Sequence, residues 1–192
     1  GVRVKISLPH ELEVFKDRLL GVLTGSPGQQ LMITNLLAKN LAGWKIQILA
    51  TDISTAMLAK ARAGRYSQLE MNRGLPAPLL IKYFRKDGTD WVIKDEIRHM
   101  VEFRELNLAE RWPALPGMDI VMMRNVMIYF DVALKKDILL RVRQVMRPDG
   151  FFMLGSAETT LSLDEAFQRE QIDRAVVYRL SGAKTGRERV GV

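Results

Sequence analysis

Apolar residues recur along the chain in two periods, which predict helices alternating with short strands. From Leu12 to Leu23, apolar positions fall at the three-to-four-residue spacing of an amphipathic helix. Residues 45–50 and 118–123 are instead short, continuous apolar runs, typical of buried parallel strands. Further strands are predicted at 91–93, 101–106, 151–154 and 176–180, and further helices at 30–41, 74–84 and 134–146.

Residues with special backbone preferences mark the ends of several of these elements. Ser54 is a good N-cap for a helix that runs to Ala63, and Gly64 is a typical stop. The sequence Asp-Gly-Thr at 87–89 predicts a hairpin turn, and Pro-Asp-Gly at 148–150 is expected to end the preceding helix.

The alternation of strands with helices predicts an α/β fold. Such a chain forms a mostly parallel sheet with helices on both faces. Ligands of these sheets bind beyond the carboxyl ends of the strands. We therefore expect a site where three predicted strands end, at Asp52, at residues 106–108 and at residues 123–125.

Composition narrows the possible functions. The 192 residues suffice for one domain with a core, no cysteine is present, and two histidines make a metal site implausible. The chain has no apolar run of membrane-spanning length and no signal peptide, so we expect a cytoplasmic protein. A net charge of +7 suggests a nucleic acid, an anionic lipid or an acidic protein as partner, although it could equally serve solubility.

An acidic residue, Asp52, ends the strand predicted at 45–50. A carboxylate in this place can accept hydrogen bonds from both vicinal hydroxyls of a ribose. The same position also suits a residue that only caps the following helix, so the sequence leaves both interpretations open.

A second polar group follows the strand predicted at 118–123. Arg124, Asn125 and Tyr129 lie where this strand would open into the ligand crevice. Arginine presents a planar fork that suits a carboxylate, and tyrosine adds a hydroxyl beside an apolar ring. An exposed arginine and a core tyrosine are the alternative.

A glycine-rich loop would be expected after the first strand of a nucleotide-binding domain. The sequence offers only Gly-Ser-Pro-Gly at 25–28, and no strand is predicted before it. By itself this segment predicts an ordinary turn.

Five segments together resemble the CheR-type family of chemoreceptor glutamate methyltransferases. They are ILATDIS (48–54), MLAKARAGRYS (57–67), VEFRELNL (101–108), MRNVMIYF (123–130) and RPDGFFMLGSAE (147–158). The resemblance extends from residue 45 to about residue 180 and keeps the order and approximate spacing of the family.

The resemblance implies a class I methyltransferase fold, Rossmann-like, that binds S-adenosylmethionine and releases S-adenosylhomocysteine. Asp52 would hold the ribose of the cofactor, and Asn107 and Leu108 would flank the adenine. Met123 and Arg124 would line the pocket near the sulfonium. As catalytic residues, Arg124 and Tyr129 would orient the substrate carboxylate and the methyl donor.

The sequence departs from the family near its start. No N-terminal helical domain and no central first strand are predicted. Residues 26–30 look like the end of the glycine-rich loop, so Gly28 and Gln30 become candidate cofactor contacts, with glutamine where the family has a carboxylate. We expect the methyltransferase domain at 1–182 and a basic tail at 183–192.

The resemblance also implies methyl-accepting chemoreceptor cytoplasmic domains as partners. A small antiparallel insertion at about 85–106 would contact them. Basic residues could steer their acidic methylation regions to the enzyme, although a solvated surface charge is the plainer interpretation of each one. These residues are Arg62, Arg65, Lys82, Lys86 and Arg98.

Two other functions remain open. One is a degenerate, non-catalytic regulatory domain that binds the cofactor. The other is a nucleic-acid methyltransferase, but no basic stripe interleaved with aromatic residues supports it. We therefore expect no nucleic-acid partner and no direct insertion into a membrane.

Overall fold

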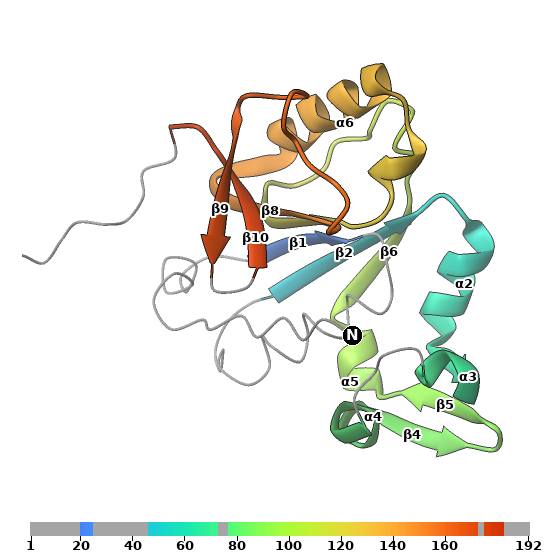
Figure 1. Ribbon diagram of the computed structural model, residues 1–192. Helices are drawn as coiled ribbons and strands as arrows, with labels where there is room; N and C mark the ends of the chain where they lie inside the picture. Colours follow the sequence, from blue (N-terminus) through green and yellow to red (C-terminus); the bar gives the residue numbers. More distant parts are fainter. Residues whose placement is uncertain (1–19, 25–45, 73–76, 173–174, 183–192) are drawn as a thin grey trace, which may run out of the picture.

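Seven strands form one large sheet in the computed structural model, which describes residues 20–24, 46–72, 77–172 and 175–182 (Figure 1). The strands lie in the order β6-β2-β1-β7-β8-β10-β9. Their bounds are β1 Leu20–Thr24, β2 Ile46–Asp52, β6 Val101–Glu105, β7 Met118–Met123, β8 Met146–Leu154, β9 Phe167–Ile172 and β10 Ala175–Leu180.

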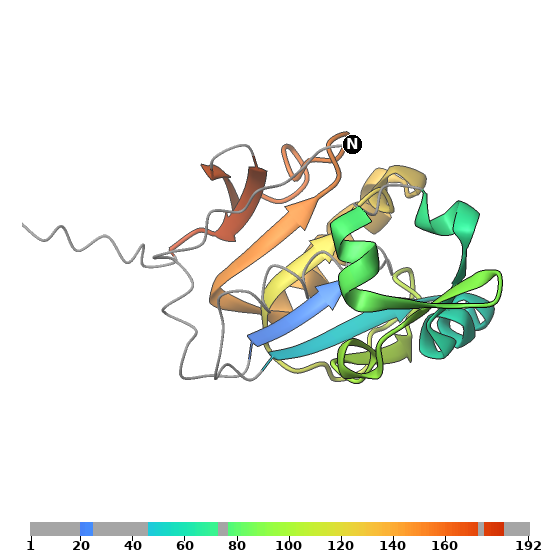
Figure 2. The same ribbon diagram turned by 90° about the horizontal axis from the view of Figure 1, so that it is seen from below.

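The first five strands of this order are parallel, and β10 runs against both of its neighbours. In Figure 2 the arrows of β1, β2, β7 and β8 (blue, cyan, yellow and orange) point the same way. The chain proceeds outward from β1 to β2 and β6, and then returns to the other side of β1 with β7 and β8. The strand order therefore reverses between β1 and β7, which is where open α/β sheets bind ligands.

The prediction that a central first strand is missing is wrong. Residues predicted as the end of a helix, Leu20–Thr24, form β1 in the middle of the sheet. They pair with β2 on one side and with β7 on the other. A short apolar run such as LGVLT fits either a helix or a buried strand. Only its pairing with a neighbouring strand on each side identifies it as a strand.

Helix α6 Val132–Val145 packs on the large sheet (Figure 1). It begins at Asp131, whose carboxylate accepts a hydrogen bond from the Leu134 N–H at 2.8 Å. Its inner face is fully buried and joins β7 and β8 in the main core. The core residues with no exposed surface are Val121, Ile138, Leu139, Val142 and Phe152.

Helix α2 Thr55–Ala63 follows β2 directly and has both of its predicted caps. Ser54 accepts a hydrogen bond from the Met57 N–H, and Gly64 ends the helix with a left-handed φ of 63°. A Cβ on Gly64 would lie 2.5 Å from the side chain of Ile93, so a larger residue does not fit here.

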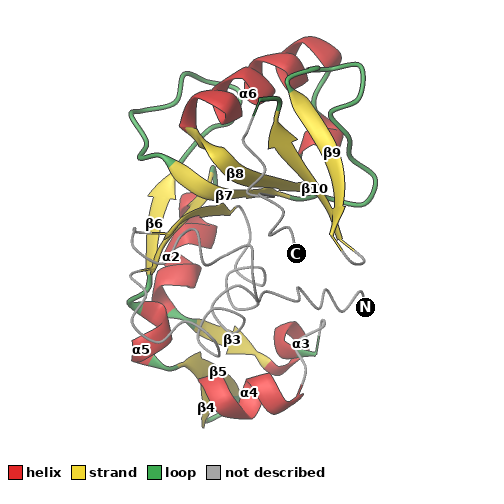
Figure 3. Cartoon of the chain, turned by 90° about the vertical axis from the view of Figure 1, so that its left-hand side faces the viewer, coloured by secondary structure: helices red, strands yellow, loops and turns green. Residues whose placement is uncertain are grey.

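A second, smaller sheet of three antiparallel strands follows α2. It consists of β3 Arg65–Ser67, β5 Asp90–Ile93 and β4 Phe84–Asp87, in that order. Three short helices accompany it: α3 Gln68–Met71, α4 Ala77–Tyr83 and α5 Asp95–Arg98. Figure 3 shows this sheet at the far end of the molecule from α6. Its separate core includes Met71, Tyr83, Phe84, Ile93 and Ile97.

Several predicted boundaries differ from the structure. The hairpin turn at Gly88 is present between β4 and β5. The small sheet, however, begins already at β3, and β6 pairs with β2 in the large sheet instead of extending the insertion to 106. The helix and the tail predicted at 30–41 and 183–192 lie outside the described residues.

Two further differences concern the end of the chain. Pro-Asp-Gly at 148–150, expected to end the preceding helix, lies within β8, because the helix already ends at Val145; β9 is not predicted from the sequence. Within the part of the chain that the structure describes, no helix has the length and apolar character to cross a bilayer.

Candidate functional site

A cavity of about 320 Å³ opens where β2, β6 and β7 end. Its volume lies within the range of small-ligand sites, and its position matches the reversal of the strand order. Apolar side chains and a few polar groups line it. The lining residues are Thr51, Asp52, Ile53, Leu106, Asn107, Leu108, Met122, Met123, Arg124, Asn125, Val126 and Phe130.

The last residue of β2, Asp52, is half-buried at the wall of this cavity. Its Oδ1 accepts a hydrogen bond from the Ser54 N–H at 2.8 Å, which fixes the orientation of the carboxylate. Its Oδ2 makes no hydrogen bond to any other residue within the described ranges. Both interpretations from sequence are thus compatible, because one oxygen secures the turn and the other can still accept from a ligand.

The segment after β6 supplies a second wall. The Asn107 side chain accepts a hydrogen bond from the Ala109 N–H and donates one to Glu110, so it stabilises its own turn. The Leu108 carbonyl accepts a hydrogen bond from Arg141 Nη1 at 2.7 Å, which ties this segment to α6. Leu108 also packs against the main core, and its side chain therefore presents a fixed apolar surface.

The segment after β7 supplies the third wall and its positive charge. Met123 is buried, whereas Arg124 is half-buried. The Arg124 guanidinium has no ion-pair or hydrogen-bond partner among the residues that the structure describes. A guanidinium without a partner can bind an anionic group that enters the cavity.

A carboxylate that the sequence reasoning missed holds this third wall from behind. Glu158 accepts hydrogen bonds from the backbone N–H groups of Asn125, Val126, Met127 and Gly155. Glu158 lies in the RPDGFFMLGSAE segment that carries the family resemblance. Its role could not be found from spacing, because Glu158 is more than thirty positions from three of its four partners.

Five of the predicted site residues meet in the cavity, one does not, and two lie outside the described residues. The five are Asp52, Asn107, Leu108, Met123 and Arg124. Tyr129 lies in the short 3-10 helix Met127–Tyr129, has 79% of its surface exposed and is not among the lining residues. Gly28 and Gln30 lie outside the described residues.

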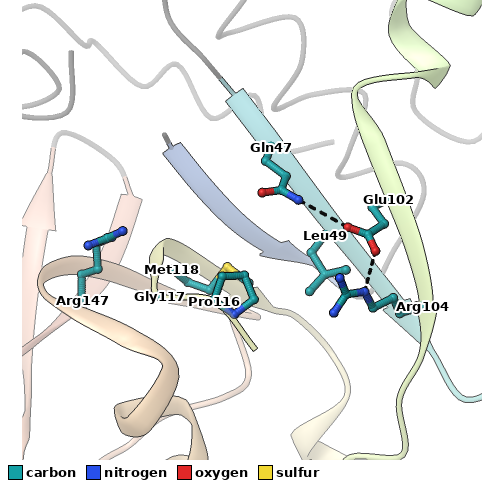
Figure 4. A pocket seen from close by; sticks show the side chains of 8 residues that line it. All are labelled: Gln47, Leu49, Glu102, Arg104, Pro116, Gly117, Met118 and Arg147. Atoms are coloured by element: carbon teal, nitrogen blue, oxygen red, sulfur yellow. Dashed lines mark hydrogen bonds and ion pairs between the residues drawn. The ribbon is translucent and has the colours of Figure 1, made fainter. Parts of the chain in front are cut away.

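A second cavity, of about 60 Å³, lies at the opposite end of the large sheet (Figure 4). Its polar side chains bind one another. Glu102 accepts hydrogen bonds from Gln47 at 3.3 Å and from Arg104 at 2.6 Å, and the bond from Arg104 lowers the pKa of Glu102. In Figure 4, residues 116–118 lie between Arg147 and the three bonded side chains of Gln47, Glu102 and Arg104.

The donor set of the larger cavity fits a nucleoside that carries a charged tail. It combines one open carboxylate oxygen, apolar walls and one open guanidinium. The fold is that of a class I methyltransferase. It is similar to the solved structure of a TehB-like SAM-dependent methyltransferase from Corynebacterium glutamicum, with a TM-score of 0.52 and 13% identity over 88% of this chain and 85% of that one.

The chain belongs to the family described as "CheR methyltransferase, SAM binding domain", which matches residues 27–176. Its cofactor is S-adenosylmethionine, as the resemblance implied. The chain is 42% identical to chemotaxis protein methyltransferase 1 of Pseudomonas aeruginosa over 70% of its length, and 40% identical to chemotaxis protein methyltransferase Cher2 of Pseudomonas putida over 69%. It spans about half the length of these relatives, 49% of each.

Proposed function

We propose that the protein transfers a methyl group from S-adenosylmethionine to glutamate side chains of bacterial chemoreceptors. One observation carries the proposal: a single cavity joins Asp52 from the end of β2 with Arg124 from the end of β7. The relatives are named chemotaxis protein methyltransferases, which supports the choice of substrate.

The cofactor, when bound, supplies an electrophilic methyl group on its sulfonium. The side chains of this protein bind and orient. Asp52 Oδ2 accepts hydrogen bonds from the ribose hydroxyls, while Leu108 and its neighbours enclose the adenine. Arg124 would hold the acceptor carboxylate, and Tyr129, which is exposed just after the lining residue Val126 and just before Phe130, would help to orient it.

No general base is required in this reaction. A glutamate carboxylate has a pKa of about 4.3 in water and is ionised at neutral pH. The protein must therefore strip water from the carboxylate and align it. This explains why a site without histidine can suffice, since neither His10 nor His99 is needed.

The positive charge of the chain supports an acidic protein partner. Among the basic residues considered for steering, Arg65 binds Asp87 at 2.7 Å and Arg98 binds Asp95 at 2.8 Å, so their charges are partly neutralised. Lys82 and Lys86 are exposed and lie over aromatic rings, and Lys86 also donates hydrogen bonds to Gln68 and to the Thr89 carbonyl, so neither charge is paired with a carboxylate within the described ranges. These two lysines are the better candidates for the encounter with a glutamate-rich helix.

A methyl-transfer assay on variants of Arg124 and Tyr129 tests the proposal. The protein is mixed with receptor-containing membranes and methyl-labelled cofactor, and base-labile label is counted as methyl ester. Arg124→Ala and Tyr129→Phe should each reduce transfer at least about tenfold, because each removes a group that orients the acceptor. Binding of S-adenosylhomocysteine, measured by calorimetry, should change much less.

Two results would contradict this proposal. Unchanged turnover in both variants would remove Arg124 and Tyr129 from the reaction. Cofactor binding by the unsubstituted protein without transfer to any receptor would favour a regulatory domain that acts by contact. An RNA or DNA control in the same assay should remain unlabelled.

A further inference from the structure

The loops after β7 and β8 leave the large sheet side by side. The two strands are parallel neighbours, and their pairing continues up to Met123 opposite Leu154. The next residues of each strand therefore lie next to one another although they are about thirty positions apart in the sequence. One loop begins with Arg124 at the cavity, and the other begins with Gly155.

A tight turn brings Glu158 back onto the loop after β7. The Glu158 N–H donates a hydrogen bond to the Gly155 carbonyl at 3.0 Å, which closes the turn. The side chain then accepts four backbone hydrogen bonds. Oε2 accepts from the N–H groups of Gly155 and Asn125, both at 2.7 Å, and Oε1 accepts from those of Met127 at 2.7 Å and Val126 at 2.9 Å.

These bonds hold a backbone conformation that the loop would not favour alone. Asn125 has a φ of 58°, in the left-handed region that residues other than glycine rarely adopt. Three consecutive N–H groups, those of Asn125, Val126 and Met127, converge on one carboxylate in this conformation. Charge-assisted hydrogen bonds of this length are about twice as strong as neutral ones, and they offset the strain.

Gly155 allows the loops after β7 and β8 to approach each other closely. A Cβ at this position would collide with the Asn125 side-chain oxygen and would lie 2.6 Å from Glu158 Oε2 and 2.9 Å from the Asn125 N. The two loops approach so closely here that only a residue without a side chain fits.

We propose that Glu158 is a positioning residue that shapes the cofactor cavity through the backbone of residues 125–127. The inference rests on the proposed function, with Met123 and Val126 forming the wall that encloses the sulfonium end of the cofactor and Arg124 holding the acceptor beside it. Glu158 does not line the cavity. It fixes the direction in which the chain leaves β7, and thereby the position of the Arg124 guanidinium and of Val126 in the cavity wall.

The replacement Glu158→Gln tests this role with almost no change in size. An amide retains one acceptor oxygen, but its NH₂ group would face two backbone N–H donors, so two of the four bonds are lost. Affinity for S-adenosylhomocysteine should fall about tenfold. Affinity for adenosine, which reaches only the walls at Asp52 and Leu108, should fall less than about threefold. Calorimetry on the full chain measures both.

The matched control is Glu165→Gln. Glu165 is exposed, and its side chain has no hydrogen bond or ion pair within the described ranges, so this variant removes the same charge without touching a loop. Both affinities should equal those of the unsubstituted chain. A change in this control as large as that in Glu158→Gln would attribute the effect to net charge and overturn the proposal.

A second variant, Gly155→Ala, reaches the same loop without changing a charge, and it keeps the test decisive if Glu158→Gln does not fold. This variant should also weaken the binding of S-adenosylhomocysteine more than the binding of adenosine. Gly117→Ala is its control, because a Cβ there would meet only the Arg147 side chain at 3.5 Å, an ordinary contact. Equal losses for the two ligands, or no loss in any folded variant of the pair, would overturn the proposal. Failure of the unsubstituted chain to bind either ligand would instead contradict the proposed function.

Discussion

The two ends of the large sheet use their polar residues in opposite ways. Near the amino ends of β2 and β6, Gln47 binds Glu102, which also accepts a hydrogen bond from Arg104 further along β6, beside a cavity of only about 60 Å³. At the carboxyl ends, the cavity of about 320 Å³ leaves Asp52 Oδ2 and the Arg124 guanidinium without partners among the described residues.

The difference shows how the fold separates stability from binding. At the carboxyl ends, the loops are held by backbone groups and by residues outside the cavity, such as Glu158 and Arg141. Two polar groups that face the cavity, Asp52 Oδ2 and the Arg124 guanidinium, therefore remain open to a ligand. At the amino ends, the polar side chains themselves link neighbouring strands. Substitutions at one end should alter affinity, and substitutions at the other should alter stability.

The largest expected effect is the loss of cofactor affinity in Asp52→Asn. The amide can keep the bond from the Ser54 N–H through its oxygen, but its NH₂ group cannot accept from a ribose hydroxyl. Affinity for S-adenosylhomocysteine should fall about 100-fold, since two hydrogen bonds to a charged group are lost. Calorimetry measures the change, and the urea midpoint should remain nearly constant.

The control for Asp52→Asn makes the same chemical change at the other end of the sheet. Glu102→Gln also converts a carboxylate to an amide, but it should leave cofactor affinity unchanged. If both variants lost affinity to the same degree, the two ends of the sheet would not differ in function as described.

The next effect should be a loss of stability without a loss of affinity. Asp119 at the start of β7 is fully buried, and its Oδ1 lies 3.4 Å from Arg147 Nε at the start of β8. Asp119→Asn removes the charge that compensates the arginine, so the free energy of unfolding should fall by about 2 kcal/mol. Urea denaturation measures this loss. An Asp119→Asn protein of normal stability but weakened cofactor binding would reverse the assignment of the two ends.

The smallest effect concerns neither end of the sheet. Lys60 binds Glu70 at 2.6 Å between α2 and α3, and this bond together with those from Ser67 lowers the pKa of Glu70 to about 2 from an ordinary 4.5. A lowered pKa in the folded state means that the stabilisation is present above pH 4.5 and is lost as the pH falls through 2.

Acid titration of Glu70→Gln tests this expectation. Glu70 is one-third exposed, so solvent screening limits the contribution to about 1 kcal/mol or less. Between pH 4.5 and 2 the unsubstituted protein should lose stability more steeply than the variant, as followed by circular dichroism during urea denaturation. Parallel curves would show that the Glu70 interaction contributes nothing. Cofactor affinity at neutral pH should be the same in both proteins.

Local patterns in the sequence predicted the strands next to the cavity but not every partner strand. β2 and β7 are continuous apolar runs and were predicted nearly to the residue. The sequence predicts the end of a helix at residues 20–23, where the structure has β1, because the identity of this strand depends on pairing with two strands distant in sequence. β9, with the sequence FQREQI, has too few apolar residues to show a strand pattern and is fixed only by pairing with β10.

The same distinction applies to the site. Asp52, residues 107–108 and residues 123–124 were predicted because they directly follow apolar strands, and parallel strands end at one edge. Glu158 acts through the register of β7 and β8, which no local pattern encodes. The exposure of Tyr129 was likewise not predictable, since it depends on the short 3-10 helix that Glu158 helps to begin.

The most direct test of the cofactor site is a titration of the isotope-labelled protein with S-adenosylhomocysteine, followed by amide chemical shifts. The account predicts that the largest changes occur at the ends of β2, β6 and β7, around Asp52, Leu108 and Asn125. Residues at the opposite end, such as Gln47 and Glu102, should remain unchanged. Shifts concentrated at the opposite end, or none at the carboxyl ends, would contradict it.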